Sequence, residues 1–281
     1  MPVPVFILAG QSNVGFLSSG IESAFDEEYG VGNYELVRVF DGGAPLTRER
    51  EDDLDWSDPD ELREQLTVET ADALLEDDDR VFGGMIWVQG EADSFFTNGA
   101  NQYGDELDEL IDGFRDDVAA ILGESDVGID QAPVTILELS ENAPDAPDRA
   151  GWDAVINGQR AVAEDDPLVQ TVDPDVVAQD AEVPVWEMFQ DGLHYAEDFG
   201  NILAEELVQT LIEPQFDETD DEDIGTDEDP ELPVIPVVDE SPVEDDQDAE
   251  ANADIDDDGG FGFEAILFLI PFFPLLAAIA G

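Results

Sequence analysis

The sequence contains no cysteine and no lysine, only one histidine and few basic residues of any kind. Without cysteine, disulfides, thiolate catalysis and cysteine-ligated zinc are excluded. A histidine-rich metal site is excluded too, because His194 stands alone. Eight arginines oppose 74 acidic residues, and the formal net charge is −66. So negative a chain argues against binding to nucleic acid and to anionic lipid headgroups, since both attract positive charge.

The same excess of acidic residues predicts adaptation to salt. Repulsion among carboxylates destabilises a compact state. Salt relieves this repulsion, because the screening length shrinks to roughly 3 Å at 1 M. We therefore expect a halophilic or marine protein whose folding weakens at low ionic strength.

Signals for export or membrane attachment are weak at both ends of the sequence. The short apolar run 3–9 lacks a preceding basic region and a cleavage site, so we expect no secretory signal peptide. Residues 265–280 form sixteen uncharged residues that include Pro271 and Pro274. As a helix they would span about 24 Å, short of the roughly 30 Å of a bilayer core. A membrane-associating tail, an export signal and a partner-docking segment stay open. The run favours a cell-surface or extracellular location, and the alternative is the cytoplasm of a salt-adapted organism.

Residues 1–212 alternate short apolar runs with amphipathic stretches, which predicts one α/β domain. The apolar runs are rich in β-branched or aromatic residues and indicate buried parallel strands at 3–9, 34–40, 81–88, 133–139 and 168–172. Helical spacing of apolar residues predicts helices at 60–75, 101–122, 152–163 and 196–212. We expect a doubly wound sheet with helices on both faces, in which ligands bind beyond the carboxyl ends of the strands.

Residues 213–260 differ in composition and are expected to form a disordered acidic linker, followed by an apolar tail at 261–281. Within the linker, Asp254, Asp256 and Asp258 begin like a calcium loop. The glutamate expected at position twelve stands at position eleven, as Glu264. We therefore interpret the match as part of the linker rather than as a calcium site.

The first motif, Gly10-Gln11-Ser12-Asn13, directly follows the first predicted strand. It places Ser12 at a strand-to-helix turn, exposed at the top of the sheet. Gly10 allows the tight turn, and the backbone N–H of Ser12 can face a developing oxyanion. Taken alone, a serine in this place most often serves only as a helix cap.

The second motif is Trp87–Asp93, at the end of the third strand. Gln89 followed by Gly90 puts an amide donor beside open backbone, which suits an oxyanion hole. Glu91 and Asp93 could instead be the carboxylate pair of a glycoside hydrolase. In a chain with 74 acidic residues, they could equally be surface charge.

The third motif, Asp191-Gly192-Leu193-His194, precedes the last predicted helix. A lone histidine is usually a structural residue. Here the aspartate three positions earlier can reach the imidazole and set its tautomer, which leaves the other nitrogen free to take a proton. A serine nucleophile needs such a base at neutral pH.

At these three motifs the sequence resembles the sialate O-acetylesterase-like branch of the SGNH hydrolases, which deacetylate carbohydrates. Members carry Gly-Gln-Ser-Asn after the first strand, Trp-x-Gln-Gly-Glu-x-Asp, and a late Asp-Gly-x-His, matched here at 10–13, 87–93 and 191–194. Their Gly-Gly turn has a counterpart in Gly42-Gly43. The resemblance covers roughly residues 3–212 and implies a three-layer α/β/α, flavodoxin-like fold with a central parallel sheet.

The resemblance also implies a role for each motif residue. Ser12 would be the nucleophile, His194 the general base and Asp191 the residue that orients it. The oxyanion would be held by the Ser12 N–H, a Gly42 or Gly43 N–H and the Gln89 side chain. The supporting residues would be Gly10, Gln11, Asn13, Gly90 and Glu91.

The function that these features favour is an O-acetylesterase acting on acetylated sugars or polysaccharides, with no cofactor or metal required. One rival is a non-catalytic carbohydrate-binding or surface protein that retains the fold; the intact Ser12, Asp191 and His194 argue against it. Another is a lipase or thioesterase on the same scaffold, for which apolar residues near Ser12 would form the acyl pocket: Phe16, Leu17, Phe95 and Phe96.

Overall fold

The computed structural model describes residues 2–51, 53–77, 79–123, 127–131 and 133–212. The acidic linker predicted at 213–260, its calcium-like stretch and the apolar tail predicted at 261–281 lie outside the described residues. Within the described part, no helix is both long and apolar enough to cross a membrane.

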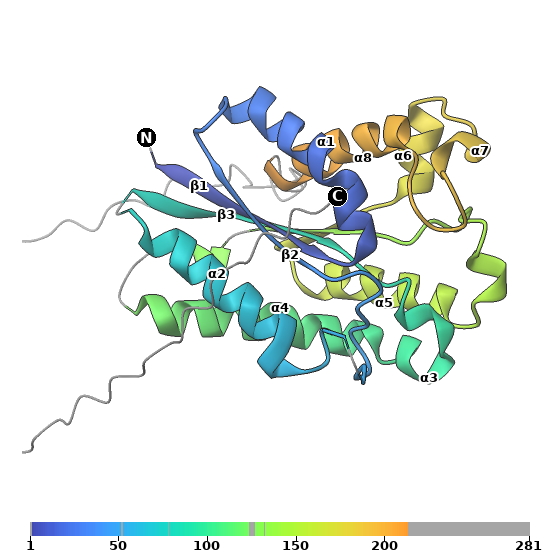
Figure 1. The fold of residues 1–281 in the computed structure, drawn as a ribbon, viewed down its shortest axis with the longest axis horizontal. Helices are drawn as coiled ribbons and strands as arrows, with labels where there is room; N and C mark the ends of the chain where they lie inside the picture. Colours follow the sequence, from blue (N-terminus) through green and yellow to red (C-terminus); the bar gives the residue numbers. More distant parts are fainter. Residues whose placement is uncertain (1, 52, 78, 124–126, 132, 213–281) are drawn as a thin grey trace, which may run out of the picture. The chain divides into compact units, whose positions relative to one another are not determined.

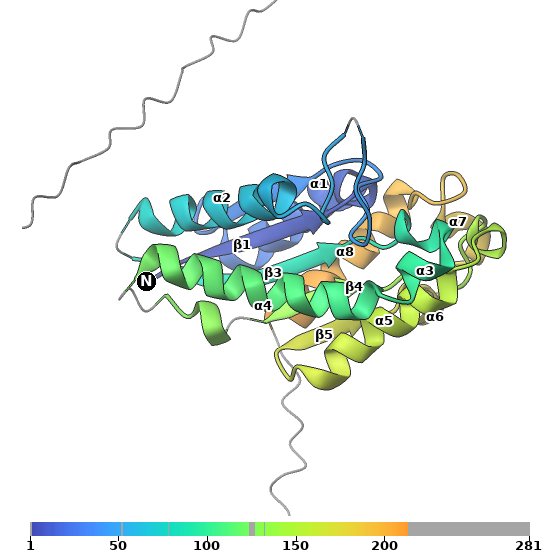
Figure 2. The same ribbon diagram turned by 90° about the horizontal axis from the view of Figure 1, so that it is seen from below.

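Five parallel strands form one central sheet (Figures 1 and 2). They are β1 (Val3–Gly10), β2 (Glu35–Phe40), β3 (Arg80–Val88), β4 (Val134–Leu137) and β5 (Val169–Val172). Their order across the sheet is β2-β1-β3-β4-β5, which is the flavodoxin-like order of doubly wound proteins. The predicted fold class is thereby confirmed.

Helices cover both faces of the sheet. One face carries α1 (Ser12–Tyr29) and α8 (Glu197–Ile212), and the other carries α2 (Glu64–Leu75), α4 (Tyr103–Leu122) and α5 (Trp152–Asp165) (Figures 1 and 2). Shorter helices lie in the connections: α3 (Thr97–Ala100), α6 (Pro174–Asp180) and α7 (Val185–Met188). Single turns complete the described elements: η1 (Pro59–Arg63), η2 (Asp93–Phe95), η3 (Ile129–Gln131) and η4 (Ala146–Asp148).

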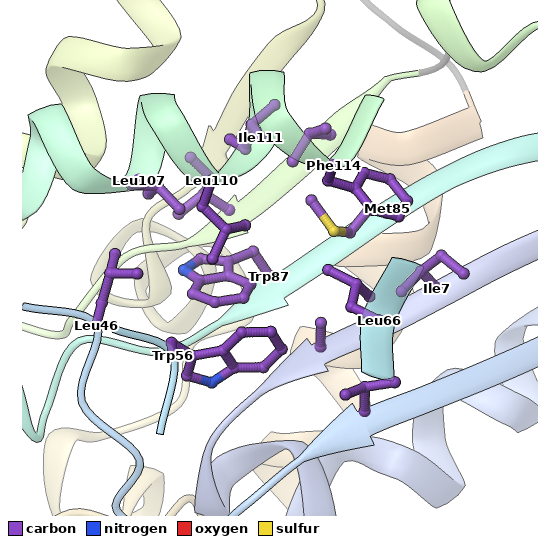
Figure 3. Packing of buried hydrophobic residues seen from close by; sticks show 14 of the residues in the cluster. Ile7, Leu46, Trp56, Leu66, Met85, Trp87, Leu107, Leu110, Ile111 and Phe114 are labelled. Carbon is purple, nitrogen blue, oxygen red and sulfur yellow. The ribbon is translucent and has the colours of Figure 1, made fainter. Parts of the chain in front are cut away.

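The alternation of side chains along each strand divides the apolar core into two layers. In β1, Val5 and Ile7 join the layer under α2, α4 and α5, whereas Phe6 and Leu8 join the layer under α1 and α8. Figure 3 shows the first layer, in which Trp87 packs edge-on against Trp56 at 4.8 Å between ring centroids. Both faces of β1 are buried, as expected of a central strand in a parallel sheet.

The predicted elements differ from the observed ones by a few residues at their ends, and two of these differences have a visible structural basis. The predicted helix 60–75 begins as a π turn, η1, with non-helical backbone at Glu61, and becomes α-helical at Glu64. The predicted strand 133–139 ends at Leu137, because the N–H of Leu139 donates to the side chain of Gln159 at 3.0 Å rather than to a neighbouring strand. These shifts leave the order of the elements unchanged.

The order of the strands has its switch point at the carboxyl ends of β1 and β3. From β1 the chain continues to β2 on one side, whereas β3 lies on the other side, so the connections diverge at this point. Gly10 pairs with Val88 across the two strand ends. Gly10 has φ +143°, and a Cβ there would lie 1.9 Å from the Val88 carbonyl oxygen, so only glycine fits. Ser12 stands two residues after the end of β1, and Gln89 stands one residue after the end of β3.

Candidate active site

Ser12, His194 and Asp191 form a hydrogen-bonded chain at the carboxyl edge of the sheet. Nε2 of His194 lies 3.0 Å from Oγ of Ser12, and Nδ1 lies 2.8 Å from Oδ2 of Asp191. Ser12 is the first residue of α1, and Asp191 and His194 belong to the loop before α8. Residues 182 positions apart are therefore brought into contact in the arrangement expected of a nucleophile, its base and the group that orients the base.

The loop that carries His194 is held by Asp191 itself. Oδ1 of Asp191 accepts hydrogen bonds from the backbone N–H groups of Leu193 and His194, both at 2.8 Å. These two donors, together with the His194 ring, lower the pKa of Asp191 to about 2. Asp191 is thus ionised near pH 7, and its second oxygen, Oδ2, is free to accept a hydrogen bond from Nδ1 of His194 and to orient the ring.

Asn13 connects this loop to the second motif. Its side-chain amide donates to Oε1 of Glu91 at 2.5 Å and to the carbonyl of Leu193 at 3.3 Å. Its oxygen accepts from the N–H of Tyr195 at 3.3 Å. Asn13 therefore holds the residues on both sides of His194.

Glu91 is buried, although it belongs to a very acidic chain. Burial raises its pKa, an effect that the hydrogen bond from Asn13 partly opposes. One of its oxygens, Oε2, has no hydrogen-bond partner. The interpretation of Glu91 and Asp93 as surface charge is wrong, because Glu91 is 6% exposed and Asp93 1%.

Asp93 holds the loop after β2. Its carboxylate accepts from the N–H groups of Leu46 and Thr47, from the Thr47 hydroxyl and from the Gln89 side chain. A buried carboxylate with this many donors is a structural centre and cannot reach a substrate. This burial overturns the alternative in which Glu91 and Asp93 act as a glycoside hydrolase pair.

Gln89 does not point its amide donors at Ser12, contrary to the prediction of an oxyanion contact. Its Nε2 donates to Asp93 at 2.6 Å and to the Ala44 carbonyl at 3.0 Å, and lies 3.3 Å from Oε1 of Gln11. The residue is 1% exposed. Both of its N–H bonds are therefore used to join the loop after β2 to the loop after β3, which is a supporting role that it shares with Gln11.

The turn after Gln89 depends on Gly90. Gly90 has φ +140°, and a Cβ there would lie 2.7 Å from the side chain of Val155. Its carbonyl accepts from the N–H groups of Asp93 and Ser94, which closes the turn. Gly90 thus allows the third strand to end in close contact with α5.

Two residues that the sequence analysis missed also hold this turn. Arg149 donates to the carbonyl of Glu91 at 2.5 Å and lies over the ring of Phe95 at 3.9 Å. Gln159 donates to the carbonyl of Gln89 at 3.0 Å. Neither lies in a motif, and the available signal was slight: Arg149 is one of only eight cations in the chain.

Gly42 and Gly43 follow β2, whose last residue, Phe40, pairs with Gly10. Gly43 has φ +73°, which favours glycine in this turn. Both glycines are exposed, and they lie in the loop that follows the carboxyl end of β2. Within the described residues, no group of three or more histidine, aspartate and glutamate side chains is arranged to hold a metal ion.

The doubly wound sheet and the Ser–His–Asp chain at its carboxyl edge are features of the SGNH class of serine hydrolases. Residues 36–183, just over half of the chain, match the family described as carbohydrate esterase, sialic acid-specific acetylesterase. The chain belongs to this family and is a carboxylic ester hydrolase. The matched region includes the Trp87–Asp93 motif and excludes Ser12 and His194.

Solved structures show the same fold at low sequence identity. A protein from Arabidopsis thaliana is 16% identical, with a TM-score of 0.55, and the match covers 75% of this chain and 98% of that one. A protein named NanS is 14% identical, with a TM-score of 0.56, and the match covers 75% and 97%. No curated protein matches the sequence.

Proposed function

We propose that this protein is a serine esterase that removes O-acetyl groups from carbohydrates. The observation that carries the proposal is the continuous contact from Ser12 Oγ through both ring nitrogens of His194 to Asp191, with distances of 3.0 and 2.8 Å. Membership of a family described as sialic acid-specific acetylesterase supports an acetylated sugar as the substrate.

In the acylation step, Oγ of Ser12 attacks the acetyl carbonyl while Nε2 of His194 takes its proton. The resulting imidazolium is stabilised by the carboxylate of Asp191. His194 then passes the proton to the sugar oxygen as the C–O bond of the ester breaks. Water, deprotonated by the same imidazole, next attacks the acetyl-enzyme. The bond from the acetyl carbon to Oγ breaks, His194 returns the proton to Oγ of Ser12, and acetate is released.

The oxyanion would form beside the start of α1. Ser12 occupies the first position of this helix, where the backbone N–H has no acceptor within the helix, and the helix dipole favours negative charge there. The second donor that we propose is the N–H of Gly42 or Gly43, from the loop beside the end of β1. Removing one such donor typically lowers the rate by about 10²–10³-fold.

The test is hydrolysis of p-nitrophenyl acetate and release of acetate from an acetylated sugar, both in 2 M NaCl at pH 8. We expect Ser12→Ala and His194→Ala to lose nearly all activity while keeping the thermal midpoint of the wild type. Ser18→Ala is the matched control, because Ser18 lies on the same helix and its hydroxyl bonds to the carbonyl of Val14. Ser18→Ala should keep full activity.

A folded wild type that hydrolyses neither ester would overturn the proposal. So would Ser12→Ala or His194→Ala variants that match the wild type. Either result would favour the alternative of a non-catalytic protein that retains the fold.

A further inference from the structure

Phe16 is an exposed aromatic residue in contact with the imidazole of His194. The two ring centroids lie 4.6 Å apart at an interplanar angle of 37°, and Phe16 is 44% exposed. Ser12 and Phe16 are four positions apart on α1, so their side chains lie on the same face of the helix. Phe16 therefore borders the reacting serine and its base together.

The apolar surface beside Ser12 extends past Phe16. Gly15 is exposed, and a Cβ there would lie 3.7 Å from the ring of Phe40, which is itself 39% exposed. In a chain with 74 acidic residues, two partly exposed phenylalanines around a bare glycine form an uncharged area next to the nucleophile.

The three other apolar residues of the acyl-pocket alternative make different contacts. Leu17 is fully buried in the core. The guanidinium carbon of Arg149 lies 3.9 Å from the centroid of the Phe95 ring, and that of Arg48 lies 5.2 Å from the centroid of the Phe96 ring. Phe16 is thus the member of the four that contacts the catalytic histidine.

The proposed chemistry decides which part of the substrate meets Phe16. His194 must deliver its proton to the leaving oxygen, so the leaving alcohol has to lie against Nε2. The carbonyl oxygen points the other way, to the backbone N–H of Ser12. A ring that flanks the imidazole therefore contacts the alcohol part of the ester rather than the acyl part.

We propose that Phe16 stacks against the sugar ring of the leaving alcohol and thereby selects carbohydrate esters over esters of small alcohols. The C–H groups on one face of a pyranose are apolar and weakly positive, and they complement the negative face of an aromatic ring. This inference rests on the proposed esterase function. It adds a specificity-determining residue outside the Ser–His–Asp chain.

The experiment compares two acetate esters that share the acyl group and differ in the alcohol: methyl tetra-O-acetyl-glucopyranoside and ethyl acetate. Acetate release is measured in 2 M NaCl at pH 8 for wild type, Phe16→Ala, Phe16→Leu and Phe16→Tyr. The ratio of kcat/KM for the glucoside to kcat/KM for ethyl acetate should fall about tenfold in the Ala and Leu variants, mainly through KM. Phe16→Tyr should keep the wild-type ratio within about twofold, because it retains the ring.

Ile121→Ala is the control for truncating an exposed apolar side chain, since Ile121 is 49% exposed and lies in the last turn of α4. This variant should leave both substrates unaffected. Equal losses on the two esters in Phe16→Ala, or a wild-type ratio in Phe16→Leu, would overturn the inference. So would a wild type that hydrolyses ethyl acetate but not the glucoside.

A butyrate series separates the acyl side from the alcohol side. If Phe16→Ala changes the preference between ethyl acetate and ethyl butyrate more than the preference between alcohols, Phe16 contacts the acyl group and the inference is wrong. Failure of the esterase function itself looks different, because the wild type would then hydrolyse none of the esters.

Discussion

Replacing Asp191 by asparagine tests the proposed catalytic chain at its most specific point. Oδ1 accepts two backbone N–H groups, and Oδ2 faces Nδ1 of His194 at 2.8 Å. Asparagine can keep the first pair of bonds through its carbonyl oxygen, but it then presents an NH₂ group to Nδ1. That nitrogen must give up its proton to accept the bond, so the proton moves to Nε2. His194 in this tautomer cannot take the proton of Ser12.

The expected loss is large in kcat and small in stability. In the serine protease triad, the same change costs about 10⁴-fold in kcat. Asp191 is 52% exposed here, so water can partly replace it, and we expect about 10²–10⁴-fold, or about 3–5 kcal/mol of barrier. The lowered pKa of Asp191 stabilises the fold above the ordinary aspartate pKa, and this contribution is lost as the pH falls toward about 2. Solvent screening limits it to less than about 1 kcal/mol.

The assay is p-nitrophenyl acetate hydrolysis beside a thermal melt, both in 2 M NaCl at pH 8. Asp145→Asn is the matched control, because the side chain of Asp145 is similarly exposed at 47% and its backbone N–H donates to the carbonyl of Gly192, the residue after Asp191. It should retain kcat within about twofold. An Asp191→Asn variant within threefold of the wild type, or an equal loss in Asp145→Asn, would refute the assigned role of Asp191.

Three further predictions concern stability. Burial raises the pKa of Glu91, so its contribution to stability is fully present only below the ordinary glutamate pKa and is lost as the pH rises through the raised value. The free energy of unfolding of Glu91→Gln, measured in urea, should therefore rise relative to that of the wild type between pH 5 and pH 8. A constant difference between the two proteins over this range would contradict the prediction. Gly10→Ala should cost at least about 3 kcal/mol, because its Cβ meets the Val88 carbonyl at a strained φ, whereas Gly113→Ala has open space in a helix and should stabilise by about 0.5–1 kcal/mol. Equal free energies of unfolding for Gly10→Ala and Gly113→Ala would contradict the close approach of Gly10 to the Val88 carbonyl. The thermal midpoint should rise from 0.1 to 2 M NaCl, since nearby carboxylates add to burial in raising the pKa of Asp108; equal midpoints would rule out the expected salt dependence.

The sequence by itself determined the architecture and the residues that come together at Ser12. Five apolar runs and the helical spacing between them were sufficient for the doubly wound sheet, because burial on both faces leaves a local pattern in each strand. The parallel order of strands then requires that residues following the strands share one edge. The motifs at 10–13 and 87–93 follow β1 and β3 and lie at the same edge for this reason. The motif at 191–194 follows no strand; it precedes α8, which packs in one apolar cluster with α1, the helix that begins at Ser12.

Only the tertiary structure decided what each polar residue in the motifs bonds to. Gln89 was predicted to face the oxyanion, yet its donors are taken by Asp93 and Ala44. In the sequence Asp93 is one of 74 acidic residues, yet its buried carboxylate accepts hydrogen bonds from four donor groups. The contact of Phe16 with His194 could not be predicted from the sequence pattern either. Burial and hydrogen-bond partners depend on which distant segments pack together, and a local sequence pattern does not record that.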